Sequence, residues 1–131
     1  MSSPFQELNP LKIAAWADFI RTVREFFYIK DVLEVSTPLL SPTSVTDPNI
    51  SSIKCELKAD NNYSYGYLQT SPEYAMKRLL AAGSGCIYQI CPAFRDDAHS
   101  PIHRAEFTML EWYRLGYDYN KLMLEVAELL K

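Results

Sequence analysis

A loop between two expected strands concentrates side chains that can bind ions. Residues 94–107, FRDDAHSPIHRAEF, include the charged or titratable residues Arg95, Asp96, Asp97, His99, His103, Arg104 and Glu106. A guanidinium keeps its charge and offers two parallel donors to a phosphate or a carboxylate. Arg95, where the first strand meets the loop, is therefore the candidate for binding an anion.

The strand after this loop, residues 107–114, has two unlike faces. Because side chains alternate along a strand, Phe107, Met109, Glu111 and Tyr113 share one face, and the residues between them face the core. A flat ring, a thioether, a carboxylate and a phenol in one row are unusual for a solvated surface. Glu111 and Tyr113 are the candidates for binding a cation.

The preceding strand, CIYQICPAF at residues 86–94, supplies the other half of this face. Counted in steps of two, Arg95, Ala93, Cys91 and Gln89 point the same way. If the two faces coincide, the small Ala93 and Cys91 leave a floor for a ligand. The pattern then predicts a ligand with a phosphate at one end and an ammonium at the other. Pro92 has no amide hydrogen, so it indicates an edge or a bulge.

The remaining elements place this hairpin in an α+β fold with antiparallel pairing. A helix over residues 11–27 is predicted because apolar residues recur at steps of three and four. TSPEYAMKRLLAAG predicts a second helix, with Ser71 as cap, Pro72 at its first position and Gly83 at its end. Further expected elements are strands at 32–35, 52–57 and 65–68 and a last helix at 119–130.

Composition limits the class of protein. The chain has 131 residues, a net charge of −3 and 48% apolar residues, which suits one globular domain. No apolar run has the length of a membrane span, and no signal peptide is evident, so we expect no membrane association and a cytoplasmic location. Three cysteines without CxxC spacing indicate free thiols and no zinc site. No stretch of the sequence concentrates lysine and arginine, so a broad nucleic-acid-binding surface is not indicated.

Three segments together resemble a known family. FRDDAHSPIHRAEFTMLEWY is similar to motif 2 of class II aminoacyl-tRNA synthetases, and TMLEWY resembles the lysyl branch. The helix and VLEVSTP resemble motif 1, and TSPEYAMKRLL resembles the lysyl-type TSPE segment. The spacing is closest to the elongation factor P lysine ligase family. The resemblance implies an antiparallel sheet with flanking helices, in which residues 1–131 are the N-terminal part of a catalytic domain, with motif 1 at about 11–38 and motif 2 at about 94–114.

The resemblance also implies an activity. The family uses ATP and Mg²⁺ to activate lysine or (R)-β-lysine as an adenylate, and transfers it to a lysine of elongation factor P instead of tRNA. Motif 3 and the Mg²⁺ ligands are expected beyond residue 131, so we expect no metal site here and an inactive fragment. A homodimer through the motif 1 region is also implied. Two alternatives stay open, a fragment of a lysyl-tRNA synthetase and a noncatalytic binding or dimerisation module.

Roles near the nucleotide follow from the family pattern. Arg95 is the implied catalytic residue, which binds the α-phosphate of ATP and the substrate carboxylate. Phe107 is implied to stack on adenine. His103 is implied to lie near the phosphates or adenine, and Asp97 to occupy the acidic position beside adenine. The structural alternative for Arg95 is an ion pair with Glu111.

Roles near the amino acid follow in the same way. Ser71 and Glu73 are implied to contact the amino or carboxylate group of the substrate, and Glu111 and Tyr113 its side-chain ammonium. Each has a structural alternative. Ser71 can simply cap its helix, Glu73 can complement the helix dipole, and Tyr113 can belong to the core with Phe107 and Met109.

Overall fold

The computed structural model describes residues 9–59, 62–96 and 103–131, which form three helices and six strands. Within these ranges no helix combines the length and apolar character needed to cross a membrane. The three cysteines are free thiols, as predicted. The elements in chain order are α1 (Pro10–Ile29), β1 (Leu33–Glu34), β2 (Leu40–Ser41), β3 (Lys54–Ala59), β4 (Asn62–Leu68), α2 (Glu73–Ala81), β5 (Ile87–Phe94), β6 (Glu106–Tyr113) and α3 (Tyr119–Leu129).

The central sheet has the order β1-β5-β6. The antiparallel hairpin β5–β6 runs in register from Ile87 opposite Tyr113 to Phe94 opposite Glu106. The predicted antiparallel pairing holds for β2–β4, β3–β4 and β5–β6, but β1 joins the other edge of β5 in parallel. Parallel neighbours need a long crossover connection, and here β2, β3, β4 and α2 lie between the two strands.

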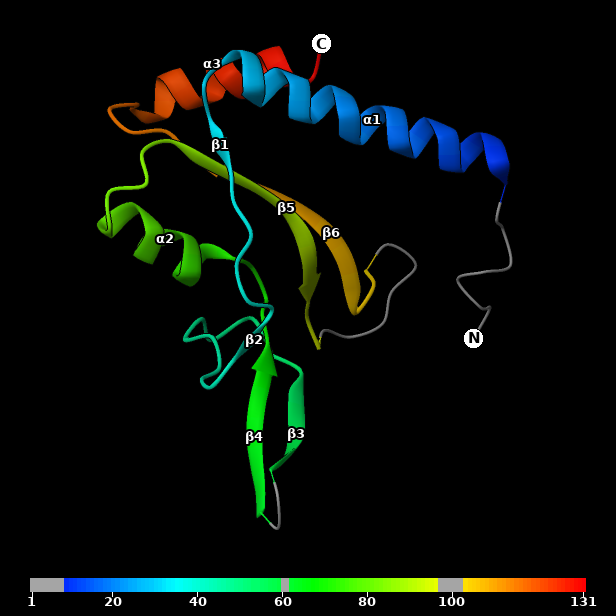
Figure 1. Ribbon diagram of the computed structural model, residues 1–131, viewed down its shortest axis with the longest axis vertical. Helices are drawn as coiled ribbons and strands as arrows, with labels where there is room; N and C mark the ends of the chain where they lie inside the picture. The colour runs from blue at the N-terminus through cyan, green and yellow to red at the C-terminus, as the bar shows by residue number, and fades with distance from the viewer. Residues whose placement is uncertain (1–8, 60–61, 97–102) are drawn as a thin grey trace.

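One face of the hairpin forms the core with α1. Val23, Phe27, Val32 and Tyr88 are buried together, with Leu110, Trp112 and Leu129 among the residues packed against them. The rings of Phe27 and Tyr88 stack with their centroids 4.4 Å apart. Figure 1 shows α1 and α3 on this side of the hairpin and α2 on the other. The core face predicted from alternation along β6 is confirmed.

The apolar stripe of α1 is only partly covered. Its C-terminal half supplies Val23 and Phe27 to the core, whereas Ile13 and Trp16 are 55% and 52% exposed. In Figure 1 the N-terminal half of α1 extends beyond the sheet. The helix was correctly predicted, but the N-terminal part of its stripe is more than half exposed.

Helix α2 begins one residue later than predicted, with Pro72 at its N-cap position. Its end matches the prediction. Gly83 has a φ of 89°, a left-handed conformation that glycine adopts without strain. The amides of Gly83 and Ser84 bond back to the carbonyls of Leu80 and Leu79, which completes the C-terminal turn.

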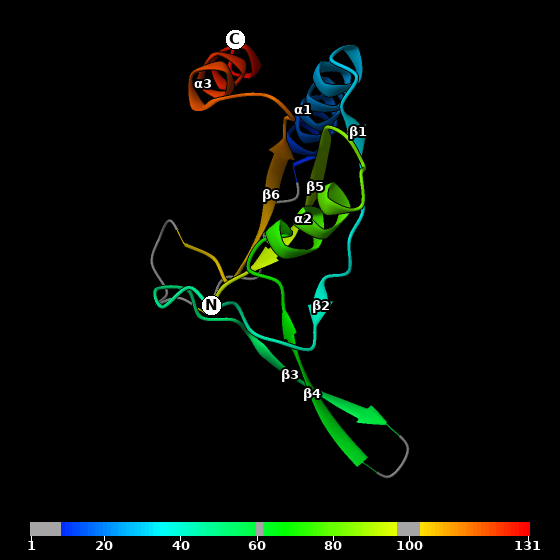
Figure 2. The same ribbon diagram turned by 90° about the vertical axis from the view of Figure 1, so that its left-hand side faces the viewer.

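A second sheet, in the order β2-β4-β3, forms a narrow ribbon. Figures 1 and 2 show β3 and β4 projecting away from the central sheet. Gly66 faces β2, where an added Cβ would lie 2.9 Å from Leu40 Cδ1. A larger residue at this position would therefore require the Leu40 side chain to shift.

Gln69 joins the ribbon to the central sheet beside Pro92. Strand β1 pairs with β5 only at Ile87 and Tyr88. Farther along, the side-chain amide of Gln69 donates to the Pro92 carbonyl at 2.8 Å, and the Gln69 carbonyl accepts from the Phe94 amide at 2.9 Å. In a strand, the N–H and C=O of one residue point to the same side. The Pro92 nitrogen, which has no hydrogen to donate, therefore faces Gln69 and not β6. The predicted edge or bulge is therefore not found as such: β5 is the middle strand and its register with β6 is continuous, but Pro92 lies beyond the residues that pair with β1.

Candidate functional site

The outer face of β5 and β6 carries the residues predicted to bind a ligand. The register pairs Gln89 with Glu111, Cys91 with Met109 and Ala93 with Phe107. Paired residues of an antiparallel ladder point to the same face. The two half-faces inferred from sequence are therefore one face, which lies toward α2.

Arg95 and Phe107 mark the end of this face that is next to the loop. The Arg95 guanidinium lies over the Phe107 ring, 5.3 Å from its centroid. The Arg95 backbone amide donates to the Ala105 carbonyl at 2.9 Å, which fixes the start of the side chain. The Nε atom of Arg95 is buried without a hydrogen-bond partner. A buried donor of this kind is costly to leave unpaired, so it favours an acceptor that a ligand supplies.

The expected alternative for Arg95, an ion pair with Glu111, does not form among the described side chains. His103 is exposed beside the loop. Asp97 lies outside the described residues, so its predicted place beside adenine stays a prediction. The described parts of the chain also contain no group of three His, Cys, Asp or Glu that could hold a metal ion.

Glu111 and Tyr113 form the other end of the face. The Tyr113 hydroxyl donates to Glu111 Oε1 at 2.7 Å. Burial raises the pKa of the Glu111 carboxyl above its usual range, and the hydrogen bond from Tyr113 opposes this rise. Burial, together with the hydrogen bond, also raises the pKa of Tyr113, so its hydroxyl stays a donor. The pair therefore presents a desolvated carboxylate, that of Glu111, which is suited to binding a cation.

The start of α2 approaches this end of the face. The Ser71 hydroxyl accepts from the Glu73 amide at 3.4 Å. Ser71 was predicted as the cap of this helix, but Pro72 occupies the N-cap position, so Ser71 contacts the helix start from one residue farther out. The Glu73 carboxylate pairs with the Lys77 ammonium one turn farther along α2. The charge of Glu73 also contributes to the raised pKa of Glu111. Glu73 and Glu111 therefore belong to one electrostatic cluster.

The floor of the face is more covered than the sequence suggested. Ala93 and Cys91 are buried, at 0% and 6% exposure. The Gln69 side chain donates to Cys91 Sγ at 3.3 Å, and the Thr37 hydroxyl donates to Gln89 Oε1 at 3.0 Å. The small residues therefore accommodate these buried amides, and a ligand must lie nearer to β6.

Gln69 was not predicted as part of the site, and Gln89 was placed on this face by alternation alone, without a role. Both are buried and hydrogen-bonded, and they tie the segments that precede α2 and β2 to the site floor. The available signal was a polar residue inside the apolar run CIYQICPAF. A buried polar side chain must find a partner, but the partner, Thr37, is far away in the sequence.

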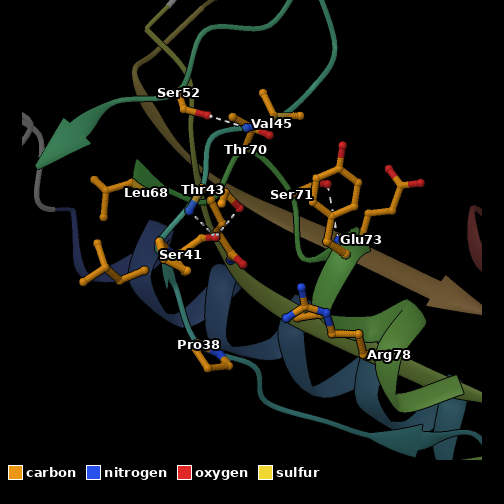
Figure 3. A pocket seen from close by; sticks show the side chains of 15 residues that line it. Pro38, Ser41, Thr43, Val45, Ser52, Leu68, Thr70, Ser71, Glu73 and Arg78 are labelled. Carbon is orange, nitrogen blue, oxygen red and sulfur yellow. Dashed lines mark hydrogen bonds between the residues drawn. The ribbon is translucent and has the colours of Figure 1, made fainter. Parts of the chain in front are cut away.

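A cavity of about 260 Å³ lies beside the site, between α2 and the segment from Pro38 to Val45. Ser71 and Glu73 line it, whereas Arg95, Phe107, Glu111 and Tyr113 do not. Figure 3 shows the Arg78 side chain extending from α2 into this space. The structure thus separates the predicted residues into the β6 face and the α2 start, which borders both the face and the cavity.

Comparisons with known proteins agree with the fold and the motifs. Residues 9–131 match the family model described as tRNA synthetases class II (D, K and N). The chain is 48% identical, over its whole length, to 42% of the elongation factor P (R)-β-lysine ligase of Vibrio atlanticus (strain LGP32). It is 52% identical to the ligase of the same name from Pseudoalteromonas translucida (strain TAC 125), over 88% of this chain and 36% of that protein.

The chain thus spans less than half of the length of these relatives. A solved structure from Leishmania major Friedlin that bears the name aspartyl-tRNA synthetase has a TM-score of 0.71 to this chain at 21% identity. That match covers 87% of this chain and 21% of the other. At this identity the likeness concerns the fold alone.

Proposed function

Because this chain belongs to the class II tRNA synthetase family of the D, K and N type, we propose that it is part of an enzyme that activates lysine or (R)-β-lysine with ATP. The activated amino acid is then transferred to a lysine of elongation factor P. The names of the relatives support this substrate and this acceptor. An acceptor that takes part in translation would place the enzyme in the cytoplasm.

The observation that carries the proposal is the order of groups along one face of the hairpin. Arg95 and Phe107 lie at one end, and the hydrogen-bonded pair Glu111–Tyr113 lies at the other. Along β6, Phe107 and Glu111 are separated by roughly 13 Å at the usual rise per residue. An extended lysyl adenylate carries a ring, a phosphate and an ammonium in this order.

The first chemical step needs a charge partner at the phosphate. The substrate carboxylate attacks the α-phosphorus of ATP, an oxygen–phosphorus bond forms, and pyrophosphate leaves. Negative charge increases on the phosphoryl oxygens as this happens, and the Arg95 guanidinium would stabilise it. Phe107 would hold the adenine ring by stacking, a contact worth about 1 to 3 kcal/mol.

The second step passes the acyl group to an amine. A neutral lysine amine of the acceptor attacks the adenylate carbonyl, an amide bond forms, the nitrogen loses one proton to solvent, and AMP leaves with the electrons of the broken carbon–oxygen bond. Mg²⁺ would neutralise phosphate charge during activation. We propose that its ligands lie beyond residue 131, since the described side chains of this chain provide no cluster for it. Glu111 and Tyr113 would hold the side-chain ammonium during both steps.

The test uses a chimera in which this chain replaces the matched region of the Vibrio atlanticus ligase, called here the completed enzyme. We expect lysine-dependent exchange of pyrophosphate into ATP by the completed enzyme and none by the 131-residue chain alone. Labelled lysine should then appear on elongation factor P and not on lysine tRNA. Labelling of tRNA would favour a lysyl-tRNA synthetase, and no exchange by the completed enzyme would favour a noncatalytic module.

A further inference from the structure

Lys77 already occupies the position of a bound cation at the amino-acid end of the site. Its Nζ atom lies 2.5 Å from Oε1 of Glu73, the residue that would contact the substrate's amino group. The two side chains are 56% and 46% exposed, so neither is held in place by surrounding packing. The ion pair can therefore open without disturbing the core.

Lys77 also acts on the second carboxylate. The titratable groups facing Glu111 are Tyr113 on β6, Cys91 on β5, and Glu73 and Lys77 on α2. Burial is the largest cause of the raised pKa of Glu111. The charge of Glu73 adds to the rise, and the charge of Lys77 opposes it. Glu73, Glu111 and Lys77 thus form a cluster of two carboxylates and one ammonium.

We propose that Lys77 is an internal competitor for the substrate, whose ammonium holds Glu73 in the empty site and is displaced when a diamino acid binds. This inference rests on the proposed function. A diamino acid brings two positive charges to two carboxylates, so one resident cation becomes superfluous when it binds. Lys77 then has to leave Glu73, and its remaining charge repels the incoming ammonium.

The test replaces Lys77 by Met in the completed enzyme and measures lysine-dependent exchange at pH 8. Exposed ion pairs contribute little, so we expect the KM for lysine to fall by about two- to fivefold, with the KM for ATP unchanged. Lys77→Arg should keep the high KM because it retains the cation. The acid limb of the pH profile for lysine should move to higher pH in Lys77→Met, since Glu111 loses the charge that lowers its pKa.

A matched control separates this effect from a change in net charge. Lys58→Met removes the same charge from β3 on the projecting ribbon and should leave the KM for lysine unchanged. An unchanged or higher KM in Lys77→Met at pH 8, or an equal fall in Lys58→Met, overturns the inference. Failure of the unsubstituted completed enzyme to activate lysine would instead refute the proposed function.

Discussion

The Tyr113 hydroxyl and the Glu111 carboxylate form a 2.7 Å hydrogen bond on the β6 face toward α2. Two residues apart on one strand, they share a face because side chains alternate. Burial disfavours the charged form of Glu111, and the hydrogen bond partly restores it. The pair therefore keeps a carboxylate in a desolvated place, where a substrate ammonium can neutralise it.

Glu111→Gln should impair the use of lysine much more than the use of ATP. The substitution keeps the shape and the hydrogen-bond acceptor but removes the charge aimed at the ammonium. Exchange by the completed enzyme, measured at varied lysine and varied ATP, should give a strongly raised KM for lysine alone. Equal effects on both substrates would indicate that Glu111 has a structural role.

The same substitution should stabilise the fold at neutral pH. The folded state binds the Glu111 proton more tightly than the unfolded state, because the pKa is raised above the ordinary value of 4.5. The free energy of unfolding therefore falls as pH rises from below 4.5 through the folded pKa. Urea unfolding of the 131-residue chain should show Glu111→Gln as more stable than the parent at pH 7, with the difference shrinking at acid pH.

Arg95→Ala should abolish lysine-dependent exchange by the completed enzyme. Removing a donor that serves charge developing in the transition state costs about 100-fold or more in rate. The loss should appear in kcat more than in KM for lysine. Arg95→Lys should retain part of the rate, because it keeps the charge but loses the second parallel donor. Unchanged exchange in Arg95→Ala would remove this residue from the chemistry.

Local patterns predicted the elements that carry the site. Alternation along one strand correctly placed Phe107 and Glu111 on one face, because the period of a strand does not depend on the rest of the chain. The same logic failed for contacts between distant segments. Strand β1 has two residues, and nothing in their sequence indicates a parallel partner at Ile87.

Burial was the least predictable property. Steps of three and four along α1 define its apolar stripe, but only the shape of the assembled sheet decides that Phe27 is covered and Trp16 is exposed. The covered floor at Cys91 has the same cause, since Gln69 reaches it from the second sheet. The role of Lys77 also could not be predicted. A glutamate and a lysine four residues apart form the same ion pair on a solvated helix face as beside a binding site, so the sequence does not distinguish the two cases.

Glu125→Ala should strongly destabilise the fold. The Glu125 carboxylate accepts from Trp112 Nε1 at 3.0 Å and lies 3.3 Å from Arg114 Nε, with only 3% and 9% of the Glu125 and Arg114 side chains exposed. Breaking a buried pair leaves an uncompensated charge, which costs about 3 to 5 kcal/mol. Urea unfolding measures this cost. Glu128→Ala is the control on the same helix as Glu125, and it removes a more exposed ion pair with Lys30, so it should change stability little. Equal effects of the two substitutions would contradict the role of burial.

The exposed part of α1 should mediate self-association of the chain. Leu11, Ile13, Trp16 and Phe19 are each more than half exposed, and the rings of Trp16 and Phe19 stack 5.6 Å apart. An apolar stripe of this kind, together with the exposed Leu33 of edge strand β1 near the other end of α1, favours a two-fold contact with a second copy. Sedimentation should show a dimer at micromolar concentration that Trp16→Glu converts to monomer. Tyr63→Glu on the projecting ribbon is the matched control and should leave the dimer intact, whereas a strict monomer in the parent chain would refute the contact.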